Sequence, residues 1–480
     1  MMPNNTVIDR FHCDNMVIRD ELGRQRLFRG INVCVKNDKF KTKKALPKIL
    51  EDKYFDVLEN NGVNIIRLGL TWELIEPKEN QFSSEIIDVY KQFVRKCRDH
   101  GIYVFLDMHQ DLFSVYCCKP QGDGAPKWAL PDDIKSKRPF AIWAEGYFYM
   151  DSVQKSFHYF WNNKNNIQEK YVQAWQHFAK EFEPFDNVIG YDYLNEPFVD
   201  KNGRKIFLNL VENVLNISLG KDLNLENNFK NCSDKAGFLK SVFQIVSTVG
   251  NFKNLKTVKE VMDSKENFAK AVRNFEKYTS DFNAKYYKPF FDKMSNHVNT
   301  YGKFNFFEHN YYSNLGIPFD IECNEKSIYS PHAYDIFVDS PLYNRYASNA
   351  RVEHIIDIIR ANQLKMNVPV IFGEWGGGAF GTEWVKHINF IMNRFEKYQW
   401  SNIYWGFNEK KKEFLKVFNR PYPVAVNGNI IKIETNSKNR IFNLIWQQDN
   451  LDSKTLVYIP DKGVVDYNGT IGENYIKIHY

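Results

Sequence analysis

Short apolar runs alternate with longer segments of helical periodicity over most of this chain of 480 residues. Segments such as 86–99 and 167–182 repeat apolar residues every three to four positions, which predicts amphipathic helices. Eight runs rich in β-branched and aromatic residues predict buried strands, and they lie at 27–33, 63–70, 102–108, 187–194, 304–308, 327–333, 369–374 and 402–406. Such alternation is typical of the α/β class. Eight units predict a (β/α)₈ TIM barrel.

Two regions depart from this alternation. Residues 201–300 are rich in Lys and Asn and are too long for one crossover helix, so we expect a helical insertion covering one side of the barrel. After about residue 415 the pattern changes to short alternating runs, with a hairpin turn predicted at the sequence NGN, residues 427–429. We therefore predict a barrel over 1–414, with its insertion at about 201–300, and a small C-terminal antiparallel β-sandwich domain over 415–480.

Composition narrows the class of protein. Hydrophobic residues make up 43% and charged residues 25% of the chain, as in a soluble globular protein. The net charge of +6 is spread along the chain without a basic block, so nucleic-acid binding is not indicated. The seven cysteines form neither a CxxC pair nor a regular framework, so we predict no metal site and no disulfide scaffold, while isolated bridges stay open.

The chain gives little information about its location. It starts MMPNNTVIDRFHCDN, without the apolar core of a signal peptide, and no run approaches the ~18 apolar residues of a membrane span. Sequons at Asn4, Asn216, Asn231 and Asn468 permit glycosylation. We expect a secreted, secretory-pathway or lysosome-like protein whose leader is absent from this sequence, and a cytoplasmic location stays open.

Polar side chains gather at the ends of the predicted strands, where barrel proteins of this type place their sites. In chain order they are Asn32, Lys36, Arg67, His109, Asp111, Asn195, Glu196, Glu308, His332, Tyr334, Glu374 and Trp405. Glu196 and Glu374 each follow an apolar run and come from non-adjacent strands, so they can converge across the barrel mouth. Two facing carboxylates are the groups that glycosidic bond cleavage requires, one as acid and one as nucleophile or base.

Each of these residues also has a structural alternative. Glu196 and Glu374 could form ordinary ion pairs, and Glu308 could serve a barrel ion pair equally well. His109 and His332 could be core histidines, while Lys36 and Asp111 could be ordinary loop charges.

The strand-end motifs resemble glycoside hydrolase family 5: IIRLGLTWE, LDMHQD, YDYLNEPF, SPHAYD, IFGEWG and IYWGF. Within that family the chain is most similar to the endoglycoceramidases, through RGINVCVKN, LDMHQDLFS, GDGAPKWA, SFHYFWNN, YVQAWQHFAKEF and RPYPVAV. The resemblance covers most of 20–200 and 300–425, is weak or absent in 201–300, and is limited to a β-rich appendage at the end.

This resemblance implies a retaining double displacement. Glu196 would be the general acid and base and Glu374 the nucleophile, with their carboxyl groups roughly 5 to 5.5 Å apart. We expect apolar surroundings and the charge of Glu374 to raise the pKa of Glu196, which must start protonated. Supporting roles are implied for Arg67 and Tyr334 on Glu374, for Asn195 on the sugar 2-OH, for His332, His109, Asp111 and Lys36 on the glycone side, and for Trp405 as a stacking floor.

Aromatic residues form 16% of the chain and gather in one predicted loop. Residues 141–163 contain Trp143, Tyr147, Phe148, Tyr149, Phe157, Tyr159, Phe160 and Trp161. They could form an apolar groove for a ceramide, or could pack the loop onto the barrel. The predicted insertion, with Phe243, Phe252 and Phe268, is a second candidate for a groove wall or a membrane contact.

We therefore predict an enzyme without a cofactor that cleaves the β-linkage between the oligosaccharide and ceramide of glycosphingolipids. Its expected partners are the glycolipid and a membrane or micelle surface, and we expect a monomer. Two alternatives stay open: a family 5 β-glucosidase acting on glucosylceramide or a steryl glucoside, and a catalytically silent glycolipid-binding barrel.

Overall fold

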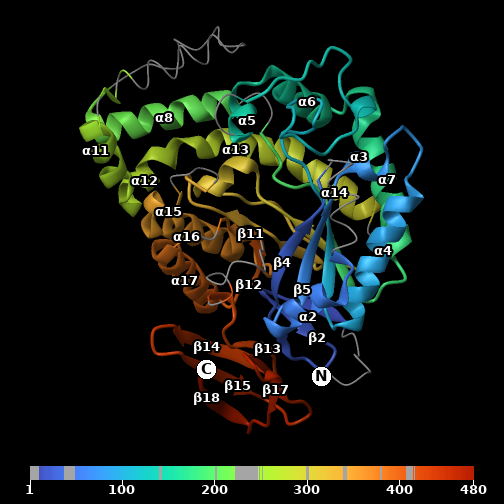
Figure 1. Cartoon of the computed structure of the whole chain (residues 1–480), viewed down its shortest axis with the longest axis vertical. Helices are drawn as coiled ribbons and strands as arrows, with labels where there is room; N and C mark the ends of the chain where they lie inside the picture. The colour runs from blue at the N-terminus through green and yellow to red at the C-terminus, as the bar shows by residue number, and fades with distance from the viewer. Residues whose placement is uncertain are drawn as a thin grey trace.

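A curled parallel sheet surrounded by helices forms the centre of the protein in a computed structural model (Figure 1). The structure describes residues 10–36, 49–139, 143–199, 203–221, 247, 249–250, 252–298, 302–338, 343–378, 381–406, 415 and 417–480. Its strands are β4 (Arg29–Cys34), β5 (Ile65–Leu70), β6 (Tyr103–Met108), β7 (Val188–Asp192), β8 (Phe304–Phe307), β9 (Ser327–Tyr329), β10 (His332–Ala333), β11 (Ile371–Gly376) and β12 (Ser401–Trp405). Each of the eight predicted runs overlaps an observed strand or strand pair.

The sheet closes into a barrel because β9 and β10 are two halves of one strand. Only Ser330 and Pro331 separate them, and β9 pairs with β8 while β10 pairs with β11. Two further bonds join the β9–β10 segment to the segment of β11. The Tyr329 N–H donates to the Pro369 carbonyl at 3.0 Å, and the Gly373 N–H donates to the Pro331 carbonyl at 3.0 Å. The predicted (β/α)₈ barrel is confirmed.

The inside of the barrel has an apolar end and a polar end, and the alternation of side chains along each strand decides which residues face inward. Ile65 of β5 belongs to an apolar cluster inside the barrel, together with Phe105, Ile328, Ile371 and Ile403. Its neighbours Ile66 and Leu68 belong instead to the larger core beneath the helices. Because successive side chains of a strand face opposite sides, Arg67 shares the inward face with Ile65, further toward the mouth.

Helices cover the outer face of the barrel, among them α2 (Asp52–Asn60), α4 (Ser84–Asp99), α7 (Ile167–Phe182), α14 (Lys288–His297), α16 (Asn349–Met366) and α17 (Gly381–Tyr398). In α4 the Ser83 hydroxyl accepts a hydrogen bond from the Ile86 N–H and caps the helix. The buried face of α4 consists of Ile87, Tyr90, Phe93, Val94 and Cys97, which follows the helical spacing. The helices predicted at 86–99 and 167–182 are confirmed.

The predicted insertion is helical where the structure describes it. It contains α8 (Gly203–Leu219), α11 (Phe252–Met262), α12 (Lys265–Val272) and α13 (Glu276–Phe282). In Figure 1, α8 extends beside the short helices α5 (Gly146–Tyr149) and α6 (Asp151–Trp161), at the end of the barrel opposite the C-terminal strands. Together these helices form an added layer over one side of the barrel mouth.

Two antiparallel sheets pack together at the opposite end of the molecule (Figure 1). One contains β13 (Tyr422–Val426), β16 (Thr455–Ile459) and β17 (Gly463–Tyr467), and the other contains β14 (Asn429–Asn436), β15 (Ile441–Gln448) and β18 (Gly472–His479). Phe442, Leu444 and Trp446 of β15 are buried against Val426 and Val457 of the facing sheet. The predicted antiparallel β-sandwich is confirmed.

The beginning of the chain also contributes to this sandwich. The strands β1 (Phe11–Asp14), β2 (Val17–Asp20) and β3 (Gln25–Arg26) continue the sheet of β13, with Ala425 paired to Arg26. The division at residue 415 stays a prediction, but any such boundary has to assign these N-terminal strands to the C-terminal sheet.

Two further observations concern the whole described chain. Among its residues, no helix is both long enough and apolar enough to span a bilayer. The six cysteines in the described segments, at 13, 34, 97, 117, 118 and 323, are free thiols, and Cys232 lies outside them.

Candidate active site

Arg67 occupies the centre of the barrel mouth and is completely buried. Its Nη1 donates to Glu374 Oε1 at 2.6 Å, and its Nη2 lies 2.7 Å from Glu308 Oε1 and 2.9 Å from Asp107 Oδ1. Its Nε donates to Asp192 Oδ2 at 3.0 Å. One guanidinium therefore joins carboxylates from four different strand ends.

The local electrostatics follow from this crowding. Burial lowers the pKa of Arg67, but the surrounding carboxylates outweigh that effect, so its pKa lies well above the usual value and the group is a permanent cation. Burial and the neighbouring Glu308 raise the pKa of Asp192 well above its ordinary value, despite the opposing charge of Arg67. Removing the guanidinium would leave several carboxylates buried and uncompensated.

Glu374 lies on β11, directly beside His332 of β10 in the strand register. Besides the bond from Arg67, its second oxygen accepts a hydrogen bond from the Tyr334 hydroxyl at 3.0 Å. A carboxylate that accepts hydrogen bonds from a charged and a neutral donor is held in one orientation.

Glu196 follows β7 and adopts an unusual backbone conformation. Its φ is +43°, a region that non-glycine residues rarely occupy, and its N–H donates to Glu308 Oε2 at 2.7 Å. Its side-chain Oε1 lies 3.0 Å from His332 Nδ1 and accepts a hydrogen bond from Asn314 Nδ2 at 3.1 Å. Burial raises the pKa of Glu196, the charge of Glu374 adds to this, and His332 opposes it.

The two carboxylates face each other across His332. Oxygen atoms of Glu196 and Glu374 and a nitrogen of His332 all lie within 4.8 Å of one another. This spacing matches the roughly 5 to 5.5 Å separation of retaining glycosidases and is shorter than the roughly 6.5 to 9.5 Å of inverting ones.

Asn195 is held within the same frame. Its Oδ1 accepts from Arg67 Nη2 at 2.9 Å, and its Nδ2 donates to the Gln110 carbonyl at 3.0 Å. Gln110 in turn donates from Nε2 to the Asn195 carbonyl at 2.9 Å. These reciprocal bonds link the ends of β6 and β7 and fix the residue that precedes Glu196.

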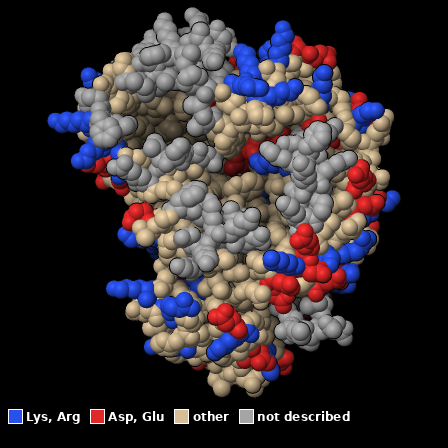
Figure 2. All heavy atoms as spheres, viewed as in Figure 1, with Lys and Arg blue, Asp and Glu red and all other residues tan. Residues whose placement is uncertain are grey.

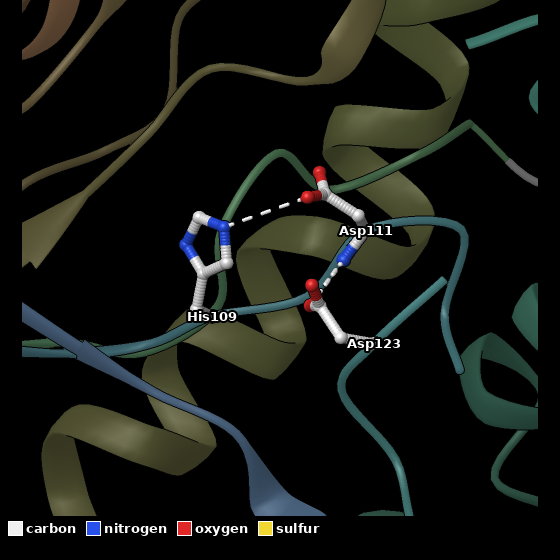
Figure 3. Close-up of side chains that lie close together, drawn as sticks. All are labelled: His109, Asp111 and Asp123. Atoms are coloured by element: carbon white, nitrogen blue, oxygen red, sulfur yellow. Dashed lines mark hydrogen bonds and ion pairs between the residues drawn. The ribbon is translucent and has the colours of Figure 1, made fainter. Parts of the chain in front are cut away.

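A second polar cluster lies at the same barrel mouth as Glu196 and Glu374. Figure 3 shows three of its residues, His109, Asp111 and Asp123. His109 Nε2 lies 3.7 Å from Asp111 Oδ2, and the Asp111 N–H donates to Asp123 Oδ1 at 2.9 Å (Figure 3). Lys36 forms ion pairs with both aspartates. Trp405 stacks on His109 with ring centroids 5.4 Å apart, and Lys36 Nζ lies 5.3 Å from the Trp405 ring.

The charges of this cluster are unevenly distributed. Burial raises the pKa of Asp123 to about 6, although Lys36 opposes the shift. For Asp111 the opposite holds, since Lys36 and His109 overcome the effect of burial and its pKa lies below the usual value. The pKa of Lys36 lies well above its usual value, because the charges of the two aspartates outweigh the burial of its ammonium group.

Both clusters open into one cavity of about 760 Å³. Its polar end is lined by Lys36, His109, Asp111, Asn195, Glu196, Tyr334, Glu374 and Trp405. The remaining wall is mainly apolar and includes Phe148, Phe207, Leu210, Val211, Val214, Leu215, Val258, Tyr311 and Ile336. Figure 2 shows a hollow with a floor of uncharged residues near α8, and acidic and basic side chains nearer the middle of the same face.

Comparisons with known proteins agree with this architecture. A model described as "Cellulase (glycosyl hydrolase family 5)" matches residues 23–237, and one described as "Glycoside hydrolase family 5 C-terminal domain" matches residues 420–470. The chain belongs to glycoside hydrolase family 5.

Two curated relatives have different names. The endoglycoceramidase of Cyanea nozakii is 27% identical in an alignment 208 residues long, and the match covers 37% of this chain and 40% of the relative. The glucosylceramidase of Aspergillus fumigatus is 27% identical in an alignment 249 residues long, and the match covers 39% of this chain and 32% of the relative. The matched part of this chain thus spans two fifths or less of their lengths.

A solved structure shares the whole fold. Endo-glycoceramidase II from Rhodococcus sp., in its ganglioside GM3 complex, superposes with a TM-score of 0.66 at 18% identity and covers 97% of this chain and 99% of its own. At this identity the likeness establishes the barrel and the appended β-sandwich, while the chemistry depends on the side chains described above.

The structure brings the ten predicted site residues together at one barrel mouth, and it divides the aromatic loop between the two alternatives that the sequence left open. Trp143 and Phe148 line the cavity, whereas Tyr147, Phe157, Phe160 and Trp161 are buried in the main core. Tyr159 packs partly buried against that core, Phe268 is buried, and Phe243 and the side chains of Tyr149 and Phe252 lie outside the described residues.

Sequence reasoning missed Asn314, Asp123 and the apolar face of α8. Asp123 stands in the quoted motif GDGAPKWA and could have been found there. Phe207, Leu210, Val211 and Val214 follow helical spacing and predict a buried stripe, but that pattern does not identify what the stripe faces.

Three groups of side chains could be considered as metal ligands among the described residues: His109 with Asp111 and Asp123; Glu196 with His332 and Glu374; and Asp107 with Asp192 and Glu308. Lys36 pairs with both aspartates of the first group, and Arg67 contacts all three carboxylates of the last. In the second group His332 contacts both glutamates, and its pKa lies well above the usual value because Glu308 and Glu374 outweigh the effect of burial. Lys36 and Arg67 therefore supply the positive charge that a metal ion would bring to the first and last groups, and His332 supplies it in the second.

Replacing the central guanidinium should destabilise the fold. Arg67→Met keeps most of the side-chain volume but leaves the carboxylates of Asp107, Asp192 and Glu308 without their cation, at a cost of about 3 to 5 kcal/mol in the free energy of unfolding. Chemical denaturation measures this change. Arg394→Met is the matched control, because Arg394 pairs with Glu353 on the partly exposed surface and its loss should cost about 1 kcal/mol or less. Equal effects would contradict the central role of Arg67.

Proposed function

We propose that this protein is a retaining glycoside hydrolase that cleaves the β-linkage between the glycan and the ceramide of glycosphingolipids. The observation that carries the proposal is one cavity with two distinct ends. Glu196 and Glu374 lie at the polar end, and the wall formed largely by α8 makes the other end apolar. Such a cavity suits a molecule with a sugar head and a hydrocarbon tail.

In the first step Glu374 attacks the anomeric carbon while Glu196 donates its proton to the glycosidic oxygen. The bond between carbon and leaving oxygen breaks, its electron pair goes to that oxygen, and ceramide leaves with the proton of Glu196. The raised pKa of Glu196 supports this role, because it keeps the carboxyl protonated at a higher pH. The bonds from Arg67 and Tyr334 support Glu374 as the nucleophile, because they fix the orientation of its carboxyl group.

In the second step water attacks the glycosyl-enzyme ester. Glu196, now a carboxylate, accepts a proton from that water, and Glu374 is released as a carboxylate. Formation of the ester removes the charge of Glu374, which is one of the causes that raise the pKa of Glu196. The pKa of Glu196 therefore falls once the ester has formed. A lower pKa favours the carboxylate, which is the form that accepts a proton from water.

The two ends of the cavity divide the work of binding. Trp405 offers an aromatic face, and Lys36, Asp111 and His109 offer charged and hydrogen-bonding groups for sugar hydroxyls. On the ceramide side, each buried CH₂ contributes about 0.8 kcal/mol. Phe148 and Phe207, stacked with centroids 4.2 Å apart, form part of that apolar wall.

A β-glucosidase acting on a lipid with a single glucose is the second candidate. The similarity to the Aspergillus fumigatus glucosylceramidase favours it, because the same catalytic pair and lipid wall would serve a shorter glycan. A silent binding protein is less compatible with Glu196 and Glu374, since sugar binding does not require two carboxylates at the spacing of a retaining enzyme.

Product analysis tests the proposed function. Incubation of the protein with a detergent-dispersed ganglioside should release ceramide and the intact glycan, as measured by mass spectrometry. Glu374→Gln should abolish this release with an unchanged circular dichroism spectrum, because it removes the nucleophile. Release of glucose from glucosylceramide, with gangliosides uncut, would favour the second candidate. No turnover of either lipid would contradict the enzyme proposal.

A charge placed on the α8 wall tests the lipid site. Val211→Asp should reduce kcat/KM for the glycolipid about tenfold or more, because the hydrocarbon chain would lose apolar contacts of roughly 1 to 2 kcal/mol. The kcat/KM for a water-soluble aryl β-lactoside should change little, since that substrate has no hydrocarbon chain. Asn216→Asp adds the same charge to an exposed position of α8 and serves as the control. Equal losses for both substrates would contradict a lipid-binding wall.

A further inference from the structure

A chain of hydrogen bonds runs from the outer layer of the barrel to Glu196 and is not part of the roles described so far. It passes from Asn362 on α16 through Tyr329, His309 and Asn314 to the Glu196 carboxyl. Tyr329 and His309 are buried to 0% and 1% exposure, Asn362 is buried, and Asn314 lines the catalytic cavity.

The outer end of this chain determines the direction of its hydrogen bonds. The backbone N–H of Phe319 can only donate, and it points at Asn362 Oδ1 at 3.2 Å. The Nδ2 of Asn362 therefore faces the Tyr329 oxygen, 3.3 Å away, and donates to it. Since that oxygen accepts, its own hydrogen is available for His309 Nδ1 at 2.9 Å.

The inner end independently requires the same direction. Asn314 contacts the Glu196 carboxyl through Nδ2, so its Oδ1 faces His309 Nε2 at 2.5 Å and has to accept. His309 thus carries its hydrogen on Nε2 and leaves Nδ1 open for Tyr329. The backbone N–H of His332 also lies 3.4 Å from Nε2, but two acceptors 2.5 Å apart would repel each other, so the shorter contact decides. A neutral ring fits this arrangement, because burial lowers the pKa of His309 to about 3.

The loop that carries Asn314 is itself anchored. Asn314 belongs to the short helix η7 (Tyr311–Leu315), which begins at Asn310, and the Asn310 side chain accepts from the N–H groups of Tyr312 and Ser313. Asn310 Nδ2 also donates to Asn283 Oδ1 at 3.0 Å. The amide of Asn314 is therefore fixed both by its loop and by His309.

Among the described residues, two side chains, those of His332 and Asn314, donate to Glu196, and both point at the same oxygen, Oε1. An oxygen that accepts two hydrogen bonds is a poor position for a proton, whereas Oε2 takes part in neither bond. We propose that Asn314, held by the chain through His309 and Tyr329, is a positioning residue that places the catalytic proton of Glu196 on Oε2. This inference rests on the proposed function, in which Glu196 protonates the leaving oxygen.

Without Asn314, the carboxyl can rotate and its proton can move to either oxygen. Protonation of a poor leaving group should then become slower, because general acid catalysis depends on geometry and supplies about 10²- to 10⁴-fold in rate. Departure of an activated phenolate needs no proton and should be almost unaffected. Attack by Glu374 is the same in both cases, so the two substrate types separate acid positioning from damage to the nucleophile or the fold.

The test compares Asn314→Ala with the unchanged protein on a ganglioside and on a 2,4-dinitrophenyl β-lactoside. We expect kcat/KM for the ganglioside to fall about 100-fold, and kcat/KM for the dinitrophenyl substrate to fall about threefold or less. Azide, which attacks without a general base, should raise kcat of the variant on the dinitrophenyl substrate. His309→Phe and Tyr329→Phe should change the ratio between the substrates in the same direction by smaller factors.

His387→Gln is the control, because His387 is another buried histidine. Its hydrogen-bond partner Asn349 is not part of the chain of hydrogen bonds that leads to Glu196. Its substrate ratio should equal that of the unchanged protein. Equal losses on both substrates in Asn314→Ala, or no loss on either, would overturn the positioning role while leaving the proposed function intact. Absence of turnover by the unchanged protein on both substrates would instead contradict the proposed function.

Discussion

The buried guanidinium of Arg67 is the interaction on which the barrel mouth depends. Carboxylates from the ends of β6, β7, β8 and β11 converge around a buried position, and such a gathering is stable only around a cation that binds several oxygens at once. The planar, multi-donor geometry of arginine suits this task. The same contacts orient Glu374 directly, and through Glu308 they hold the backbone of Glu196, so stability and chemistry share one network.

The barrel separates two kinds of environment along its axis. Apolar side chains fill the N-terminal end, the charged network occupies the mouth, and the helices beyond β7 add an apolar wall. Burial at the mouth raises the pKa of Glu196, while hydrogen bonds direct its oxygens. The position of the wall next to the carboxylate pair is the reason why we propose a substrate with both a sugar and a lipid part.

Local patterns predicted most of the fold and the central site. Each barrel strand is an apolar run bounded by helical segments, and Arg67, Glu196 and Glu374 were found because charged groups at strand ends contrast with their surroundings. Asn314 has no such contrast, and its role depends on a loop fold and a bond to His309 that no local spacing shows. The pairing of β3 with β13 joins residues about 400 positions apart, for which the chain carries no local signal. For the aromatic loop the sequence left two alternatives open, because apolar composition does not separate core positions from cavity walls.

Trapping of the covalent intermediate tests the central claim most directly. A 2-fluoro glycoside with an activated leaving group slows the second step, so the glycosyl-enzyme accumulates and can be digested and sequenced by mass spectrometry. The account predicts one added sugar on the peptide that contains Glu374, and none in Glu374→Gln. A sugar attached to Glu196 or to any other residue, or normal turnover without any attached sugar, would contradict it.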